Sequence, residues 1–200
     1  MSIPAPSDST IRYVIKPLVF IICLVPFAAL TIGAVNDTLG VNPVEKLTRE
    51  TGEWTLRLLL LTLTITPLRR ITGHTWLIKL RRMLGLFTFF YACLHFTTYI
   101  WLDQFFDWQE ILIDIPKRPF ITVGFAAFVL LIPLALTSTN KMMRRLKKKW
   151  VQLHKLVYVI AVLGCLHFLW VVKADTVEPL VYFVILLLLL GHRAIEQRRR

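Results

Sequence analysis

Two of the five histidines stand inside long apolar stretches, where ionisable side chains are uncommon. His95 follows Leu84 by 11 residues, and His167 follows Leu156 by the same number. Ionisable side chains inside a bilayer are costly and commonly mark functional sites. An imidazole in this setting can ligate a metal, carry a proton or donate a hydrogen bond within the core.

Both histidines are expected at the same depth, because 11 helical residues rise about 16 Å from the cytoplasmic side. Two helices that run in the same direction would bring these imidazoles to one level in the outer half of the membrane. Ala92 and Gly164 each lie one turn before a histidine and would leave room for a flat macrocycle. The pattern favours bis-imidazole ligation of a b-type haem by His95 and His167. A pair of hydrogen-bonded core histidines and a proton relay stay open as alternatives.

A third histidine, His154, is expected at the cytoplasmic surface, because it precedes His167 by 13 residues, or about 19.5 Å. On an ideal helix the two rings point about 140° apart, so one regular helix face does not present both. His154 is therefore either a ligand of a second cofactor or an interfacial histidine that ligates nothing.

The composition predicts an all-α membrane protein around these histidines. Hydrophobic residues make up 56% of the 200-residue chain and charged residues only 18%, against about 25% charged in soluble domains. These values exclude a soluble nucleic-acid binder and a disordered chain, despite a net charge of +12. A helix needs about 20 residues to cross a bilayer. The apolar runs predict a bundle of six transmembrane helices, near residues 18–35, 54–66, 84–102, 120–137, 156–172 and 179–190.

The basic residues predict the orientation of these helices. With the N-terminus inside, the inside segments hold 18 of the 24 Lys and Arg residues and the outside loops hold 5. Lys and Arg gather on the cytoplasmic side of membrane proteins, so both termini are expected to be cytoplasmic. The predicted parts are a cytoplasmic N-terminal segment (1–17), a transmembrane haem domain (18–192) and a basic cytoplasmic tail (193–200).

Other features of the sequence are less specific. The first apolar run could alternatively be a cleaved signal peptide, which would leave five helices with the same orientation. Cys23, Cys93 and Cys165 lie in apolar runs without metal-site spacing, which predicts small buried packing residues. No internal repeat or flexible linker is apparent.

Four stretches carry a resemblance to a known family. They are TGEWTLRLLLLTLTITPLRR (51–70), RRMLGLFTFFYACLHFTTY (81–99), KRPFITVGFAAFVLLIPLALTSTNKMMRRL (117–146) and WVQLHKLVYVIAVLGCLHFLWVVK (150–173). Through them the chain resembles the ferric-reductase-like transmembrane family over about residues 40–173.

The resemblance implies an electron conduit of the bacterial inner membrane. Electrons from the quinone pool or a cytoplasmic flavin reductase would pass through b haem to a periplasmic molybdopterin-containing subunit that reduces methionine sulfoxide in oxidised proteins. The haem-binding histidines of such proteins match His95, His154 and His167, and FMN is an implied second cofactor. The expected protein is a redox subunit rather than a complete enzyme, with one haem and a possible second.

The sequence departs from ferric reductases in two respects. Those proteins carry two histidines on each of two helices, and the extra position falls near Arg81 or Arg82, whose guanidinium is a poor haem ligand. The chain also has no G-x-G-x-x-G motif up to Arg200, so it is not expected to take hydride from NAD(P)H by itself.

Two arginines complete the predicted site. Arg57 would pair with a haem propionate, or else extend to the membrane interface as Arg commonly does. Arg82, with its basic neighbours, would hold an FMN phosphate or serve only the topology. Two other functions stay open: a six-helix transporter with His95 and His167 as a proton relay, and a self-contained ferric or quinone reductase.

Overall fold

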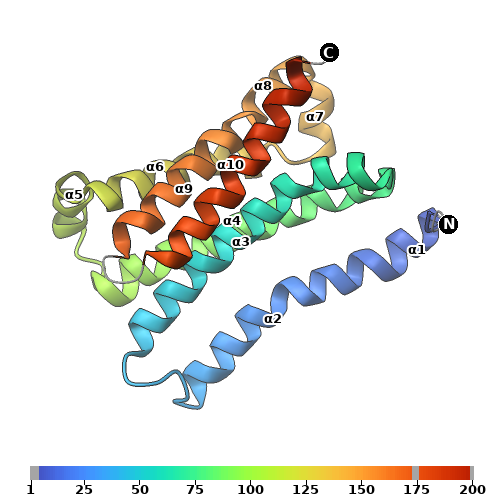
Figure 1. Cartoon of the computed structure of the whole chain (residues 1–200). Helices are drawn as coiled ribbons and strands as arrows, with labels where there is room; N and C mark the ends of the chain where they lie inside the picture. The colour runs from blue at the N-terminus through green and yellow to red at the C-terminus, as the bar shows by residue number, and fades with distance from the viewer. Residues whose placement is uncertain (1–4, 173–175, 199–200) are drawn as a thin grey trace. The chain divides into compact units, whose positions relative to one another are not determined.

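The computed structural model describes residues 5–172 and 176–198, which form helices and their connections. The all-helical fold predicted from the sequence is confirmed for these residues. The chain divides into two compact units, Met1–Thr98 and Tyr99–Arg200 (Figure 1). Parts of three predicted segments lie outside the described residues: 1–4 of the N-terminal segment, 173–175 of an outer loop and 199–200 of the basic tail.

Three long helices make up most of the first unit. Its elements are α1 (Asp8–Thr10), the π-helical segment Ile11–Ile15, α2 (Lys16–Val35), α3 (Pro43–Thr72), the 3-10 turn Thr75–Leu77 and α4 (Ile78–Thr97). Asn42 caps α3 by accepting a hydrogen bond from the backbone N–H of Glu45, a common way to satisfy a free N–H at a helix start. Gly73 ends α3 with φ of 73°, a left-handed conformation that glycine adopts without strain.

α3 and α4 lie side by side and run in opposite directions (Figure 1). Tyr91 of α4 joins α2 to this pair through hydrogen bonds. The side chain of Tyr91 is fully buried. Its hydroxyl donates to the carbonyl of Cys23 at 2.7 Å and accepts from the N–H of Phe27 at 3.0 Å. These two groups flank Pro26, which has no N–H and interrupts the hydrogen-bond ladder of α2. The tyrosine thus satisfies backbone groups on a neighbouring helix.

The second unit contains a second antiparallel helix pair, α6 and α9. Its elements are α5 (Trp108–Lys117), α6 (Pro119–Leu136), α7 (Asn140–Leu146), α8 (Lys148–His154), α9 (Leu156–Val171) and α10 (Val177–Arg198). The π-helical segment Thr98–Asp103 precedes them and continues α4. α10 packs on α9 through Phe168 and Tyr182, whose ring centres are 5.7 Å apart. The sequence did not predict α5, α7 and α8 as separate helices.

Cysteine packing agrees with the prediction for two of the three residues. Cys23 and Cys165 are buried free thiols in α2 and α9, and Cys93 in α4 is half-buried. They therefore serve as small packing residues between helices.

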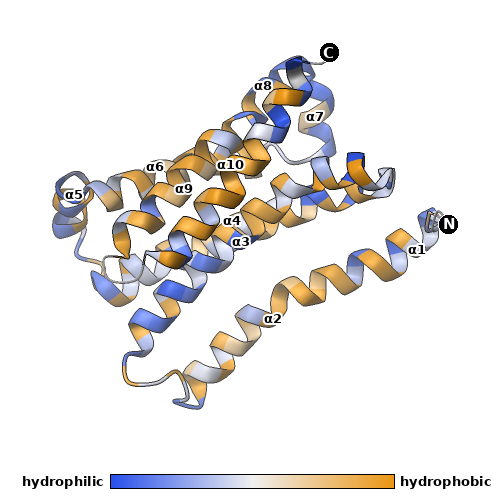
Figure 2. Cartoon of the chain, in the orientation of Figure 1, coloured by the Kyte–Doolittle hydropathy of each residue, from blue (hydrophilic) through white to orange (hydrophobic). Residues whose placement is uncertain are grey.

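Five helical stretches in the described part of the chain are long and apolar enough to cross a membrane. They are Asp8–Val35, Thr75–Asp103, Pro119–Leu136, Lys148–Val171 and Val177–Glu196. The second predicted span, 54–66, lies within α3, which has 30 residues and therefore a length of about 45 Å. α3 is more polar than the other five, as Figure 2 shows for its first turns, so the count of six transmembrane helices stays a prediction.

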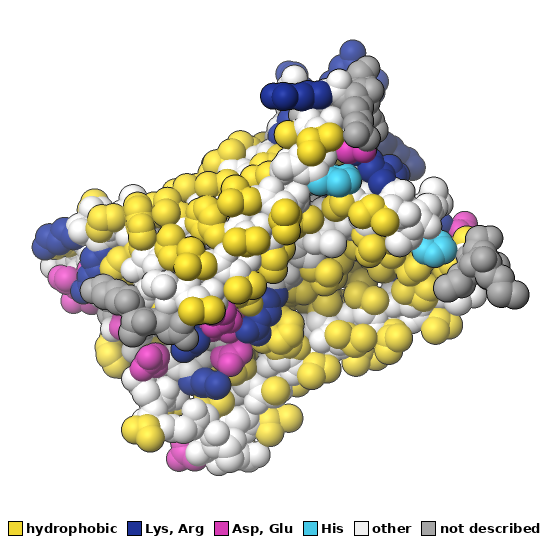
Figure 3. Space-filling model, in the orientation of Figure 1, with side chains coloured by type: hydrophobic (Ala, Val, Ile, Leu, Met, Phe, Trp, Pro, Cys, Tyr) yellow, Lys and Arg dark blue, Asp and Glu magenta, His cyan; other side chains and the backbone are white. Residues whose placement is uncertain are grey.

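Large apolar side chains face outward along these helices. In α10, Leu187 and Leu188 are 60% and 68% exposed, and in α2, Ile21 is 60% exposed. Figure 3 shows apolar side chains covering the visible flanks of the helices. Extended apolar surface of this kind indicates contact with lipid rather than water.

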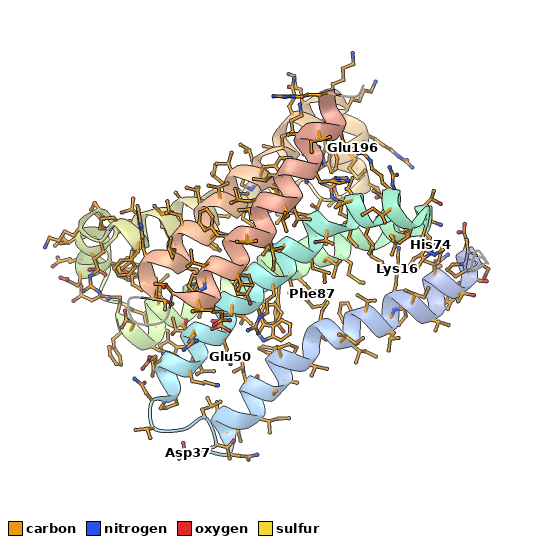
Figure 4. All side chains as sticks on the ribbon, in the orientation of Figure 1. Lys16, Asp37, Glu50, His74, Phe87 and Glu196 are labelled. Carbon is orange, nitrogen blue, oxygen red and sulfur yellow. The ribbon has the colours of Figure 1, made fainter. Side chains whose placement is uncertain are left out.

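Residues of predicted inside segments and of a predicted outside loop lie at opposite ends of the first unit. Lys16 and His74 lie near one end of this unit, and Asp37 and Glu50 lie near the other end (Figure 4). The first pair belongs to predicted inside segments and the second pair to a predicted outside loop. The side of the membrane on which each end lies stays a prediction.

Candidate functional site

His95 is held against the backbone of α3. It lies near the end of α4, and its Nδ1 is 2.9 Å from the carbonyl oxygen of Thr48. A carbonyl oxygen only accepts hydrogen bonds, so Nδ1 carries the proton of the neutral ring and donates it. The ring lone pair is then on Nε2, which is the atom that a histidine in this tautomer offers to a metal.

Gly52 makes this approach possible. It stands one turn after Thr48 in α3, beneath the ring of His95. A Cβ atom at position 52 would lie 3.0 Å from Cε1 and 3.1 Å from Nδ1 of His95. Such distances are shorter than ordinary van der Waals contact, so any larger residue would push the ring away from the carbonyl.

His167 has the same arrangement in the second unit. Its Nδ1 is 2.7 Å from the carbonyl oxygen of Phe120, the second residue of α6. The ring lies on Gly124, where a Cβ atom would come within 2.7 Å of Nδ1 and 2.8 Å of Cε1. The tautomer is therefore the same as for His95, and the fit is tighter.

The two arrangements have identical spacing in the sequence. In each one the histidine follows the accepting residue by 47 positions, and the glycine follows the accepting residue by four. The second set is displaced from the first by 72 residues, and the tetrapeptide Cys-Leu-His-Phe occurs at 93–96 and again at 165–168. The expectation that the chain has no internal repeat was therefore wrong: the repeat is short, and the apolar residues around it conceal it.

Each histidine lies at a similar distance along its span. His95 is 20 residues after the start of Thr75–Asp103, and His167 is 19 residues after the start of Lys148–Val171. Both rings contact the first turns of the preceding antiparallel helix, as the acceptors Thr48 and Phe120 show. Within its own unit, each ring thus lies toward the end that the topology predicts to be outside.

His154 has different surroundings. Its ring stacks on Trp150, with ring centres 3.9 Å apart, and its Nε2 lies 3.0 Å from Oγ1 of Thr137. Thr137 donates its single hydroxyl hydrogen to the carbonyl of Pro133 at 2.6 Å. His154 is therefore held by its Nε2 atom, whereas His95 and His167 are held by Nδ1. Metal ligation through Nε2 would require His154 to give up this bond.

Arg57 is bound to an acidic residue in the same helix. Its Nη2 atom lies 2.6 Å from Oε2 of Glu53, and its guanidinium carbon lies 5.0 Å from the ring centre of Trp54. Glu53 is only 6% exposed and also accepts from Arg49 at 2.8 Å. The pairing could have been predicted, since Glu53 and Arg57 are four residues apart on one helix face. A carboxylate ligand at Arg57 would compete with Glu53.

Arg82, the other predicted cofactor contact, is exposed in α4. Among the described residues, no three His, Cys, Asp or Glu side chains are grouped closely enough to hold a bare metal ion. A haem needs less from the protein, because the porphyrin itself supplies four nitrogen ligands and leaves two axial positions. Two histidines in the Nδ1–H tautomer suit those positions.

The fold defines a class: helical membrane proteins, here with two histidines in helices that are long and apolar enough to cross a membrane. Residues 51–165 match the family described as ferric reductase like transmembrane component. This match covers more than half of the chain, and the chain belongs to this family.

Curated relatives resemble the chain over nearly its whole length. A protein of Herminiimonas arsenicoxydans is 57% identical over 190 residues, which are 94% of this chain and 86% of the relative. Relatives from Azospira oryzae and Ralstonia nicotianae are 50% and 53% identical, over 92% and 90% of this chain and 80% and 84% of their own lengths. All three are named protein-methionine-sulfoxide reductase heme-binding subunit MsrQ. No solved structure matches the chain.

Proposed function

We propose that this protein is the haem-binding membrane subunit of a methionine sulfoxide reductase and that it conducts electrons across the bacterial inner membrane. The observation that carries this proposal is the repeated Nδ1–H to carbonyl bond of His95 and His167. Histidines that ligate metals commonly donate their other ring N–H to a carbonyl or carboxylate. The names and high identity of the relatives support the same function.

The haem would be b-type, and His95 and His167 would hold it. Haem supplies reversible one-electron oxidation and reduction when bound. The carbonyls of Thr48 and Phe120 would hold each imidazole in one orientation and increase the basicity of Nε2. These bonds also argue against a proton relay, because a backbone carbonyl has no proton to pass on.

The donor and the acceptor would be other proteins or small molecules. We propose that electrons enter on the cytoplasmic side, from the quinone pool or a flavin reductase, and leave toward a periplasmic molybdopterin-containing subunit. Both termini would be cytoplasmic, as the basic inside segments favour. FMN bound with the help of Arg82 would serve as an additional cofactor near the entry side.

The surroundings of His154 bear on the number of haems that we propose. One haem is the simplest arrangement, because Nε2 of His154 is already hydrogen-bonded to Thr137. A second haem would require this bond to break and a residue other than histidine as its opposite ligand. Arg57 would bind a haem propionate only in competition with Glu53.

The test is the visible spectrum of the purified, detergent-solubilised protein, with haem measured as the pyridine haemochrome. The wild-type protein should show a b-type α band on reduction, and His95→Ala and His167→Ala should each lose it. His74→Ala is the matched control, since this histidine lies in the connection after α3. A colourless wild-type protein produced with adequate haem would overturn the proposal and favour the proton-relay transporter.

A further inference from the structure

Two glycines in the repeat have a role that goes beyond accommodating close helix packing. Gly52 and Gly124 are the positions at which α3 and α6 contact the rings of His95 and His167. We propose that they are positioning residues, which let each ring reach a backbone carbonyl and thereby set the reduction potential of the haem. This inference rests on the function proposed above.

The distances support a role of the two glycines in orienting the histidine rings, beyond leaving space for them. At both glycines the nearest atoms to an added Cβ include Nδ1 and Cε1 of a histidine ring. Nδ1 is also the atom that donates to Thr48 or Phe120, one turn earlier in the same helix. The absent side chain and the hydrogen bond therefore act on the same edge of the imidazole.

Gly85 and Gly191, two other helical glycines, do not have this environment. A Cβ at Gly85 in α4 would meet only Cγ2 of Thr62, at an ordinary 3.9 Å, and a Cβ at Gly191 in α10 would meet nothing within 4 Å. The close approach to a histidine thus occurs at the two corresponding positions of the repeat. Gly85 and Gly191 offer matched controls for the same substitution.

The chemical consequence concerns electron donation to the iron. A strong Nδ1–H to carbonyl bond increases the basicity of Nε2, and a more basic ligand stabilises ferric over ferrous iron. Displacing the ring from the carbonyl weakens this bond, so the midpoint potential should rise. A tenfold change in the relative affinity for the two iron states corresponds to about 59 mV for a one-electron couple.

The experiment compares Gly52→Ala, Gly124→Ala, Gly85→Ala and Gly191→Ala in the full-length protein. The measurements are the haem-to-protein ratio, the midpoint potential by redox titration, and the low-spin ferric signal by electron paramagnetic resonance. We expect Gly52→Ala to keep its haem. Its midpoint potential should rise by up to about 59 mV, which corresponds to a tenfold change in the equilibrium constant. Gly124→Ala, with the shorter distances, should show a larger rise or lose its haem. Both controls should match the wild type.

Three results would overturn the inference while the proposed function stands. They are unchanged potentials in Gly52→Ala and Gly124→Ala, equal shifts in all four variants, or a lowered potential in Gly52→Ala. If Gly124→Ala fails to fold, Gly52→Ala decides the question, because its Cβ requires the ring to move only a few tenths of an ångström. Failure of the proposed function would appear separately, as a wild-type protein without haem.

Discussion

The helix pairs α3/α4 and α6/α9 are alike at one end and different at the other. At the predicted outer end, each pair holds a histidine ring on a glycine with Nδ1 donating to a carbonyl. At the predicted inner end of the second pair, His154 at the end of α8 is hydrogen-bonded to Thr137, which directly follows α6. The positions 72 residues earlier are Arg82 and Ile65. The repeat therefore holds at the predicted outer end, where we propose that His95 and His167 bind haem, and it does not hold at the predicted inner end.

A second likeness is a buried carboxylate near the predicted outer end of each unit. Glu53 is 6% exposed and bound to Arg49 and Arg57. Asp114 is 3% exposed, accepts from Arg118 at 2.7 Å and is 3.2 Å from the hydroxyl of Tyr99. The two clusters do not occupy corresponding positions of the repeat. Each unit therefore neutralises its buried carboxylate with a different set of residues.

The largest effect on stability is expected from breaking the Glu53 cluster. Glu53→Ala leaves Arg49 and Arg57 as neighbouring like charges, and removing one partner of a buried pair is strongly destabilising. Because both arginines are partly exposed, we expect a loss of about 1 to 3 kcal/mol in the free energy of unfolding. Thermal unfolding in detergent, followed by circular dichroism, measures this change.

Glu50→Ala is the matched control for Glu53→Ala. Glu50 pairs with Lys46 at 3.2 Å on the exposed side of the same helix, where such pairs contribute about 0.5 kcal/mol or less. Asp114→Ala should resemble Glu53→Ala. If all three variants lose the same stability, burial of the carboxylate is not what distinguishes these clusters.

A smaller effect is expected from Tyr91→Phe, which tests a feature found only in the first unit. The substitution leaves the N–H of Phe27 and the carbonyl of Cys23 without the hydroxyl that joins them. Loss of buried neutral hydrogen bonds costs about 1 to 2 kcal/mol, and thermal unfolding should show it.

The second unit has Leu163 at the position corresponding to Tyr91, so no equivalent substitution exists there. Tyr13→Phe is the control, because the side chain of Tyr13 is 69% exposed. A Tyr91→Phe variant as stable as this control would mean that α2 is held by apolar packing alone.

The smallest effect is expected from His154→Ala. If His95 and His167 hold the single haem, the haem-to-protein ratio of this variant should equal that of the wild type. Loss of the hydrogen bond to Thr137 should lower stability by only about 1 kcal/mol. The haemochrome assay checks the first expectation.

Thr137→Val extends this test, because it removes the hydrogen-bonding partner of His154 without touching the ring. The spectrum should again match the wild type. A haem-to-protein ratio that falls by half in His154→Ala would instead indicate a second haem. The two helix pairs would then be more alike than their hydrogen bonds suggest.

The sequence by itself determined the helical class and the membrane character of the chain, and it singled out His95 and His167 within the apolar stretches. These features depend on local properties: an apolar run of sufficient length, and a residue's count from its end. The sequence also contained the repeat of Cys-Leu-His-Phe and the four-residue spacing of Glu53 and Arg57, although hydropathy alone did not draw attention to them.

Only the tertiary structure decided which atoms each histidine contacts. The donor and acceptor of each ring bond are 47 residues apart, and their meeting depends on how two helices pack, which local patterns do not specify. The same holds for His154, whose Nε2 atom meets the hydroxyl of Thr137, 17 residues earlier in the chain. Helix packing places Gly52 and Gly124 beneath the rings, and this contact gives two otherwise ordinary glycines their role.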